Sequence, residues 1–342
     1  MGVLNLKNNV RTVVGVGSAL VDMLANASDE FIEKLGVEKG GMTLVDQDYI
    51  DRLIEQIQNS PAIVPGGSAC NTAIGVGKLG GDAKFVGKLG NDELGEFFNQ
   101  DLKKNNVKPF LFSSTTPTGR VLSLITPDAQ RSMFTCLGAS AEMQPDEVTT
   151  DCFKDAAVVH IEGYLLFNRE LMKAVLKSAQ DAGAQVSLDL ASFNVVEESK
   201  DILPDIIKES VDILLANEDE ARAYTGYTDE DKALEVLSEN VDIAVLKLGP
   251  HGSIIAHQDK KIKIDPMGSG GVVDTTGAGD LWASGFLFGL VSGYSFEKSG
   301  AIASACGYEV CRVVGADIPE DGWHRIKKLK HNGEKNGRRK IP

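Results

Sequence analysis

The stretch VVDTTGAGDLWASGFLFGL, residues 272–290, joins a turn rich in Asp, Thr and Gly to a long apolar run. Glycine lowers helix stability by roughly 1 kcal/mol relative to alanine, so Gly277 and Gly279 need a reason to precede a helical segment directly. They let the peptide N–H groups at the start of the helix expected from Leu281 approach a ligand. Since unpaired N–H groups and the positive end of a helix dipole attract anions, the stretch predicts an anion site.

Asp280 follows these glycines, and a carboxylate there would repel a bound anion. It has a chemical use if it accepts the proton of a hydroxyl group that attacks a bound phosphoryl group. The alternative is that Asp280 is only a helix N-cap, which is a common role for Asp. The stretch taken alone leaves both interpretations open.

Bulk composition limits the class of protein. The chain has 342 residues, enough for one or two domains with a substantial core. Its 35 basic and 49 acidic residues give a net charge of −14, which disfavours nucleic acid and anionic membranes as partners. The apolar run around residues 281–291 contains Ser and Gly and is typical of a core helix. The N-terminal residues do not have the pattern of a secretory signal, so we expect a cytoplasmic protein.

The five cysteines, at positions 70, 136, 152, 306 and 311, form no C-x-x-C pair. We therefore expect reduced thiols, with neither a disulfide framework nor structural zinc. GVGSAL at Gly15 is only a truncated dinucleotide fingerprint, and the G-x-x-x-x-G-K-[ST] phosphate loop is absent.

Alternating strands and helices predict the fold class. Buried strand patterns precede amphipathic helical patterns repeatedly between residues 83 and 247. This order is typical of an α/β fold, a doubly wound and mostly parallel sheet with helices on both faces. In such folds ligands bind beyond the carboxyl ends of the strands.

Two segments differ from this rhythm, and we expect them to form a small β-sheet lid inserted into the large core. They are residues 37–45 and 118–137, the second with a turn at Pro127 and Asp128. The core would then comprise residues 1–36, 46–117 and 138–331, and the basic segment 332–342 would be a frayed tail. A second copy could pair through the lid, so we expect a monomer or a homodimer.

A second glycine-rich stretch is PGGSACNTAIGVGKLGG, residues 65–81. Backbone groups of Gly66 and Gly67 and the amide of Asn71 could bind a polyhydroxylated substrate. A tight turn with close helix packing would explain the same pattern equally well.

Three further positions could bind ligand groups. Asp22 is a natural acceptor for two vicinal hydroxyls, or else an N-cap. Asn217 and Glu220 stand three apart at a helix start, which suits either helix capping or a water-mediated Mg²⁺ site. The turn KLGPHG, residues 247–252, could admit a nucleotide phosphate or base.

Taken together, these motifs resemble the ribokinase-like (PfkB) carbohydrate and nucleoside kinases. GGSACNTA, residues 66–73, resembles the N-terminal signature of that family, DTTGAGD, residues 274–280, matches the C-terminal one, and NEDE resembles its N-x-x-E motif. All three stand in family order, and the similarity spans roughly residues 13–319. The resemblance implies an α/β sandwich with a β lid, ATP as phosphoryl donor, Mg²⁺ and often a stimulating K⁺.

The resemblance also implies roles for individual residues. Asp280 would be the catalytic base, and Gly277, Ala278 and Gly279 the anion hole for the phosphoryl group. The substrate would contact Ser18, Asp22, Gly66, Gly67 and Asn71. ATP would contact Asn217, Glu220, Lys247, Gly249 and Gly252, with Mg²⁺ held through water by Glu220. Asp274 and Thr276 would lie at the K⁺ site.

The substrate follows from finer similarities. SALVDML, residues 18–24, and QRSMFTCLGAS, residues 130–140, resemble bacterial adenosine kinases more than ribokinases or fructokinases. The chain has Ser18 where an Asn usually accompanies the Asp in better-known adenosine kinases. Despite this departure, the two segment resemblances lead us to expect ATP-dependent phosphorylation of the primary, 5′-type hydroxyl of a nucleoside, with adenosine favoured. A sugar kinase and a non-catalytic nucleoside sensor are the alternatives.

Overall fold

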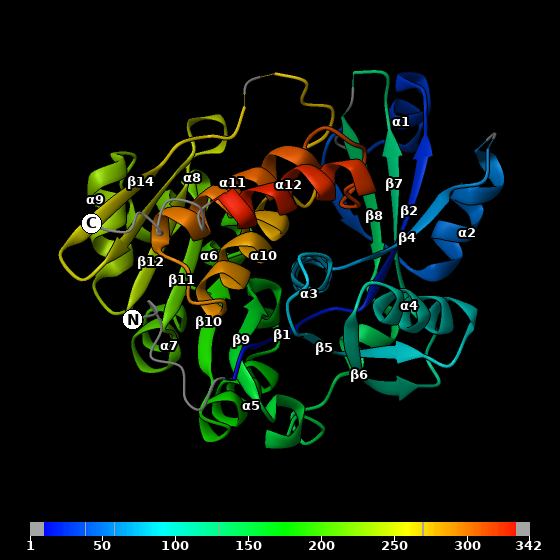
Figure 1. Cartoon of the computed structure of the whole chain (residues 1–342). Helices are drawn as coiled ribbons and strands as arrows, with labels where there is room; N and C mark the ends of the chain where they lie inside the picture. The colour runs from blue at the N-terminus through cyan, green and yellow to red at the C-terminus, as the bar shows by residue number, and fades with distance from the viewer. Residues whose placement is uncertain (1–9, 38, 58, 129, 269, 333–342) are drawn as a thin grey trace.

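The chain folds around two sheets that lie side by side (Figure 1). The computed structural model describes residues 10–332 apart from 38, 58, 129 and 269. The larger sheet has nine strands in the order β14-β13-β12-β11-β10-β9-β1-β5-β6. Neighbours from β12 to β6 pair in parallel, whereas β13 and β14 are antiparallel. The doubly wound, mostly parallel sheet predicted from the sequence is confirmed.

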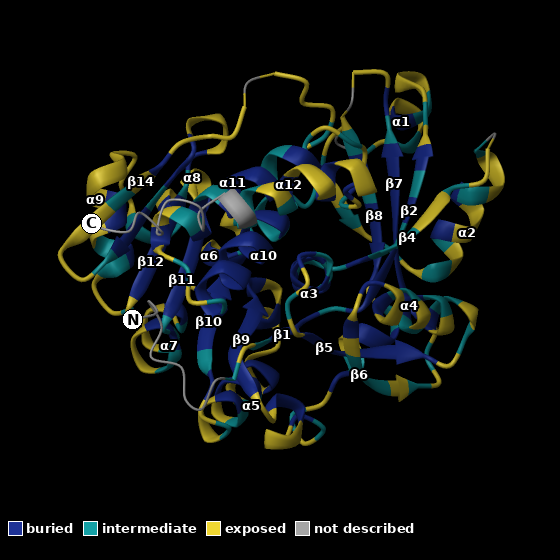
Figure 2. Cartoon of the chain, viewed as in Figure 1, coloured by how far each residue is buried: buried dark blue, intermediate teal, exposed yellow. Residues whose placement is uncertain are grey.

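The inner strands of the large sheet are buried because helices cover both faces, whereas the edge strands β14 and β6 are partly exposed (Figure 2). The strands of this sheet are β1 (Thr12–Val16), β5 (Ala83–Gly90), β6 (Val107–Ser114), β9 (Ala156–Glu162), β10 (Gln185–Asp189), β11 (Ile213–Asn217), β12 (Ile243–Lys247), β13 (Ser253–His257) and β14 (Lys260–Ile264).

Alternate side chains of each strand enter two different cores. Val13 and Val158 belong to the core on one face, and Val14 and Val159 to the core on the other. The first core is covered by α3 (Ser68–Lys78), α4 (Glu93–Lys104), α10 (Ala278–Val291), α11 (Phe296–Val310) and α12 (Glu320–Asn332). The second is covered by η3 (Thr150–Phe153), η4 (Gly163–Phe167), α5 (Arg169–Asp181), α6 (Phe193–Glu198), α7 (Leu203–Ser210), α8 (Glu218–Thr225) and α9 (Glu230–Ser238).

Small residues bring α3, α10 and α11 together. A Cβ on Gly75 of α3 would lie 2.3 Å from the Ser284 hydroxyl of α10, and one on Gly285 would lie 2.7 Å from the Cα of Ala303 on α11. Every residue of α10 from Leu281 to Val291 is buried. The long apolar run is therefore a core helix, and its N-terminus is held rigidly beside the start of α3.

The second sheet has five strands in the order β3-β8-β7-β2-β4. These are β2 (Leu20–Asn26), β3 (Met42–Leu44), β4 (Ala62–Gly66), β7 (Gly119–Ile125) and β8 (Arg131–Cys136). The helices α1 (Asp29–Leu35) and α2 (Gln47–Gln56) cover one face of this sheet, where Ile32 and Ile50 pack against Leu122 and Phe134. The sheet is larger than expected, because β2 and β4 come from segments assigned to the core.

The apolar pattern from Thr12 to Leu24 is typical of a single strand, but the chain forms two strands here, and they belong to different sheets. β1 ends at Val16 and β2 begins at Leu20. The chain turns away because Gly17 passes directly against Glu162, where a Cβ would lie 2.2 Å from the carboxylate. Asp22 therefore lies within β2 of the smaller sheet and not just beyond a strand of the larger one.

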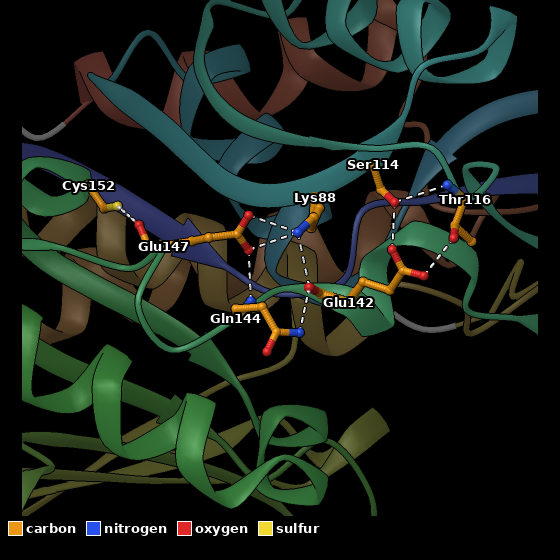
Figure 3. A network of polar contacts seen from close by, with 7 residues as sticks. All are labelled: Lys88, Ser114, Thr116, Glu142, Gln144, Glu147 and Cys152. Carbon is orange, nitrogen blue, oxygen red and sulfur yellow. Dashed lines mark hydrogen bonds and ion pairs between the residues drawn. The ribbon is translucent and has the colours of Figure 1, made fainter.

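A polar network fastens two of the connections between the sheets (Figure 3). Lys88 on β5 donates to both carboxylate oxygens of Glu147, at 2.8 and 2.9 Å, and to the backbone oxygen of Glu142 at 3.1 Å. The Glu142 carboxylate accepts from the hydroxyls of Ser114 and Thr116, at 2.5 and 2.6 Å. The segment that leads from β6 to β7 is thus tied to η2 (Gly138–Glu142), through which the chain returns.

Other expectations concern the whole chain. All five cysteines lie in the described part of the chain and are free thiols. None of the described helices is both long and apolar enough to cross a membrane. Asn332, the first residue of the expected tail, ends α12, and the rest of 332–342 lies outside the described residues.

Candidate functional site

The N-terminus of α10 is built from glycines, as predicted. Gly277 precedes the helix in a left-handed conformation, φ 70°, and a Cβ there would lie 2.7 Å from that of Ala316. No described side chain caps this end of the helix. The Ala278 amide donates to the backbone oxygen of Thr275 at 3.1 Å, whereas the amides of Gly277 and Gly279 have no partner among the described residues and keep the anion-binding character of a helix start.

Gly279 leaves a bare surface beside these amides. Outside its own helix and chain neighbours, only one described atom lies within 4 Å of the position that a Cβ would take. That atom is Nζ of Lys247, at 3.2 Å. The start of α10 therefore faces a lysine ammonium across a space that a larger residue at 279 would fill.

Asp280 is held by the first turns of α3. The Ser68 hydroxyl donates to one carboxylate oxygen at 2.7 Å, and the Asn71 amide donates to the other at 2.9 Å. The Thr72 hydroxyl donates to the backbone oxygen of Asp280 at 3.1 Å. Burial raises the pKa of Asp280, and the bonds from Asn71 and Ser68 oppose that rise. Two predicted site residues more than 200 positions apart, Asn71 and Asp280, are thus in direct contact.

Asp22 approaches the same region from the smaller sheet. β2 pairs with β4, and a Cβ on Gly66 would lie 2.5 Å from the carboxyl carbon of Asp22. Glycine at 66 is therefore what leaves room for this carboxylate. Burial raises the pKa of Asp22 to about 6, while Arg131 lowers it and Asp280 raises it further. Asp22 of β2 and Asp280 of α10 therefore lie on either side of residues 66–68, which border the first carboxylate through Gly66 and bind the second through Ser68.

Gly67 and Ser18 meet through their backbones. Gly67 has φ 99°, and a Cβ on it would lie 2.1 Å from the carbonyl oxygen of Ser18. The amides of Ser18 and Ala69 donate to the two carboxylate oxygens of Glu162, at 2.8 and 3.0 Å. Burial raises the pKa of Glu162 to about 7, although those amide bonds lower it. Glu162, on β9, thus fixes the loop after β1 against the start of α3.

Asn217 and Glu220 form a capping box at the start of α8. The Asn217 side chain accepts from the Glu220 amide at 2.9 Å, and the Glu220 carboxylate accepts from the Asn217 amide at 2.8 Å. Burial raises the pKa of Glu220 to about 7, and Lys247 lowers it. The capping interpretation of this motif is confirmed. Each Glu220 oxygen accepts from one Asn217 donor and keeps a lone pair for a metal-bound water, although Glu220 is only 2% exposed.

Lys247, at the end of β12, forms a buried ion pair with Asp189, at the end of β10. Nζ lies 2.7 Å from the Asp189 carboxylate, and the two side chains are 12% and 7% exposed. Burial lowers the pKa of Lys247, but Asp189 and Glu220 outweigh it and the net pKa is raised. The following turn needs its glycines, since Gly249 and Gly252 have φ 49° and 90°. These residues meet at the carboxyl edge of three adjacent strands.

The expected K⁺ ligands are occupied by protein groups. One carboxylate oxygen of Asp274 accepts from the amide and hydroxyl of Thr276, at 3.0 and 2.8 Å. The other accepts from the Gly315 amide at 2.8 Å and from Arg131 at 3.3 Å. Four donors saturate the carboxylate, and the Arg131 guanidinium would repel a cation. Asp274 and Thr276 therefore do not fit the side-chain role in a K⁺ site that the resemblance implied.

Three charged residues of this region were missed in the sequence. Glu162 and Asp189 are the last residues of β9 and β10, and Arg131 opens β8. The first two carry a readable signal, because a carboxylate that ends a buried strand pattern lies where α/β folds bind ligands. Arg131 carries no such signal.

Comparison with known proteins supports a kinase. Residues 41–322 match the profile of the pfkB family carbohydrate kinases. The structure is similar to that of adenosine kinase from Sinorhizobium meliloti, with 32% identity, a TM-score of 0.85, and coverage of 94% of this chain and 99% of that one.

Two curated relatives carry different substrate names. A Nucleoside kinase of Methanocaldococcus jannaschii is 30% identical over 271 residues, which cover 76% of this chain and 83% of the relative. The Probable fructokinase-4 of Arabidopsis thaliana is 31% identical over 264 residues, covering 71% and 80%. The chain therefore belongs to the pfkB family, as a kinase that acts on a nucleoside or a sugar.

Proposed function

We propose that this kinase transfers the γ-phosphoryl group of ATP to the 5′-hydroxyl of adenosine. The likeness to an adenosine kinase over 94% of the chain and the nucleoside kinase relative support this substrate. The observation that carries the proposal is one loop that serves two carboxylates: Gly66 leaves room for Asp22, and Ser68, two residues later, donates to Asp280 at the start of α10.

Asp280 is the proposed catalytic base. The 5′-oxygen bonds to the γ-phosphorus as the bond from that phosphorus to the bridging oxygen breaks, and ADP leaves with the electron pair. The hydroxyl proton passes to Asp280. Burial raises the pKa of this carboxyl, which improves it as a base, while Ser68 and Asn71 fix its orientation. The amides at Gly277 and Gly279 stabilise the charge on the phosphoryl group, and the Ala278 amide would join them on leaving the Thr275 oxygen to which it donates.

The ribose would bind between the sheets. The carboxylate of Asp22 can accept from two vicinal hydroxyls, and the backbones of Gly66, Gly67 and Ser18 border it. Asn71, predicted to bind substrate directly, donates to Asp280. In the proposed complex its amide therefore orients the base, and its carbonyl oxygen stays available as an acceptor.

ATP would lie along the carboxyl edge of β11 and β12, over Asn217, Lys247, Gly249 and Gly252. Mg²⁺ neutralises phosphate charge when bound, and the free lone pairs of Glu220 fit an ion held through water. The residues 37–45 and 118–137, with the rest of the five-stranded sheet, would act as a lid that excludes water from the reaction.

A sugar acceptor is the second candidate, since a fructokinase relative is 31% identical. A coupled assay of ADP release with adenosine, inosine, ribose and fructose separates the candidates. We expect the highest kcat/KM with adenosine and a loss of at least about 1,000-fold in kcat for Asp280→Asn, with ATP still bound. A preference for fructose or ribose would reject adenosine, and Asp280→Asn activity within tenfold of the wild type would reject the base.

A further inference from the structure

The side chain of Lys247 reaches the start of α10. β12 ends at this lysine. Its Nζ lies 3.2 Å from the point that a Cβ on Gly279 would occupy. A phosphoryl group on the α10 amides would therefore have the helix on one side and this ammonium on another. The glycine turn at 249–252, the expected nucleotide loop, begins two residues later.

Asp189 holds the Lys247 ammonium in that position, and the Asp189 carboxylate is itself fixed by a backbone amide. One carboxylate oxygen accepts from Lys247 at 2.7 Å, and the other accepts from the Ala191 amide at 3.0 Å. Ala191 has φ 63°, a left-handed conformation that is costly for a residue with a Cβ. The backbone after β10 thus adopts a strained conformation that fixes the carboxylate, which in turn fixes the lysine.

The surrounding charge favours an ammonium that meets an anion. Asp189, Glu220 and Asp280 all act on Lys247 and keep it protonated. A phosphoryl group that arrives here adds negative charge beside Asp280. Without a cation, the base and the phosphoryl group would repel each other in a poorly solvated site.

We propose that Lys247 is a catalytic residue that contacts the migrating phosphoryl group, and that Asp189 is the residue that positions it. The inference rests on the phosphoryl transfer proposed above, not on the choice of acceptor. Lys247 moves no proton: it stabilises the charge on the phosphoryl oxygens as the bond to the acceptor oxygen forms and the bond to ADP breaks. Lys247 borders the proposed ATP site, but its contribution is larger in the transition state than in the ATP complex, so its loss should lower kcat more than ATP binding.

The first test separates catalysis from ATP binding. We expect Lys247→Met to lower kcat about 100-fold, as loss of one transition-state donor does, while the ATP dissociation constant changes less than about fivefold. Lys88→Met is the matched control, because Lys88 also lies on a strand of the same sheet and forms an ion pair, with Glu147, in a network that contains no residue of α10 (Figure 3). It should lower Tm and leave kcat unchanged.

Two further variants test whether Lys247 acts on the reaction or only supports the fold. Ethylammonium should restore part of the activity of Lys247→Ala in a saturable way, which a packing defect would not show. Asp189→Asn should lower kcat about tenfold and move the alkaline limb of its pH profile to lower pH, since the ammonium loses its main carboxylate partner.

The acceptor in these assays is whichever compound the wild type phosphorylates, and ATP hydrolysis without acceptor is measured alongside. A sugar preference would then reject adenosine and leave the inference intact. If folded Lys247→Met keeps kcat within threefold of the wild type, or raises only the KM for ATP, the catalytic role of Lys247 is rejected.

Discussion

Glu162 shows how one buried side chain can organise a site without carrying out chemistry. Its two oxygens accept from the amides of Ser18 and Ala69, which belong to separate segments that border the proposed substrate region. Glycine is required at position 17 because the Cβ of any other residue would clash with the Glu162 carboxylate. The acid is fully buried, so its protonation is linked to folding.

Protonation of Glu162 makes the stability of the folded protein depend on pH in a definite direction. The folded pKa of Glu162, about 7, exceeds the ordinary value of 4.5, so the folded protein binds the proton more tightly. Its contribution to stability is complete below pH 4.5 and is lost as pH rises through about 7. Buried His160 acts in the opposite direction, because burial lowers its pKa from 6.5 to about 4. Wild type alone would therefore show a mixed profile.

Glu162→Gln should isolate the carboxyl, because His160 is the same in both proteins. We expect the free energy of unfolding of the variant, relative to wild type, to rise by about 3 kcal/mol between pH 4.5 and 7. Urea denaturation at a series of pH values measures this difference. Two parallel curves would show that the Glu162 carboxyl does not titrate differently in the folded state.

At the scale of the element, the start of α10 combines poor helix formers with rigid support. The helix gains its stability from eleven buried residues between Leu281 and Val291, so its first turn can hold glycines for binding. At Gly279, ligand binding favours glycine and helix stability favours alanine. A substitution at this position therefore changes the two properties in opposite directions.

Gly279→Ala should stabilise the helix and impair the kinase. The position is helical, so alanine fits the backbone and improves propensity by up to about 1 kcal/mol. Its methyl group would fill the space between the amides and Lys247, and we expect kcat to fall about 10- to 100-fold. Gly307→Ala on α11 is the control, since its Cβ meets only ordinary contacts from 3.5 Å outward. Steady-state kinetics and thermal melts measure both effects, and an unchanged kcat in Gly279→Ala would contradict the anion hole.

The hydrogen bonds of Asp274, in the turn before α10, lead us to expect a weak effect of monovalent cations on activity. Asp274 is saturated by Thr276, Gly315 and Arg131, and the arginine already supplies a positive charge. We expect kcat to change less than about twofold when Na⁺ replaces K⁺ at constant ionic strength. A tenfold stimulation by K⁺ would mean that this turn rearranges when it binds substrate.

At the scale of the whole molecule, the sequence predicts what is local. The alternation of strands and helices is read from hydrophobic period, and the glycine turns are read from composition. The sequence did not predict β4, because its five residues include Pro65 and Gly66. It did not predict that β1 ends at Val16 either, because the apolar pattern continues into β2. Glu162 and Asp189 act on partners 58 to 144 residues away, which only the topology brings near.

The two sheets also divide the proposed ligands between them. Asp22 belongs to the five-stranded sheet, whereas Lys247 and Asn217 end strands of the nine-stranded sheet. Nucleoside and nucleotide should therefore stabilise the protein through different residues. A ligand at 100 times its dissociation constant adds about 2.7 kcal/mol to the free energy of unfolding, enough to raise Tm measurably.

Asp22→Asn should reduce one of these shifts and keep the other. Loss of a charged acceptor weakens hydroxyl binding by about 1.5–3 kcal/mol, so adenosine at 100 times its wild-type dissociation constant should add only about 0.3–1.3 kcal/mol and raise Tm much less than in the wild type. A non-hydrolysable ATP analogue should raise the Tm of the variant as much as that of the wild type. Asp212→Asn, which alters a carboxylate bonded to Val186 at the opposite strand edge, should preserve both shifts. If Asp22→Asn loses the shift from the ATP analogue as well, the two ligands do not bind through separate sheets, and Asp22 supports the fold of the whole site instead of the nucleoside alone.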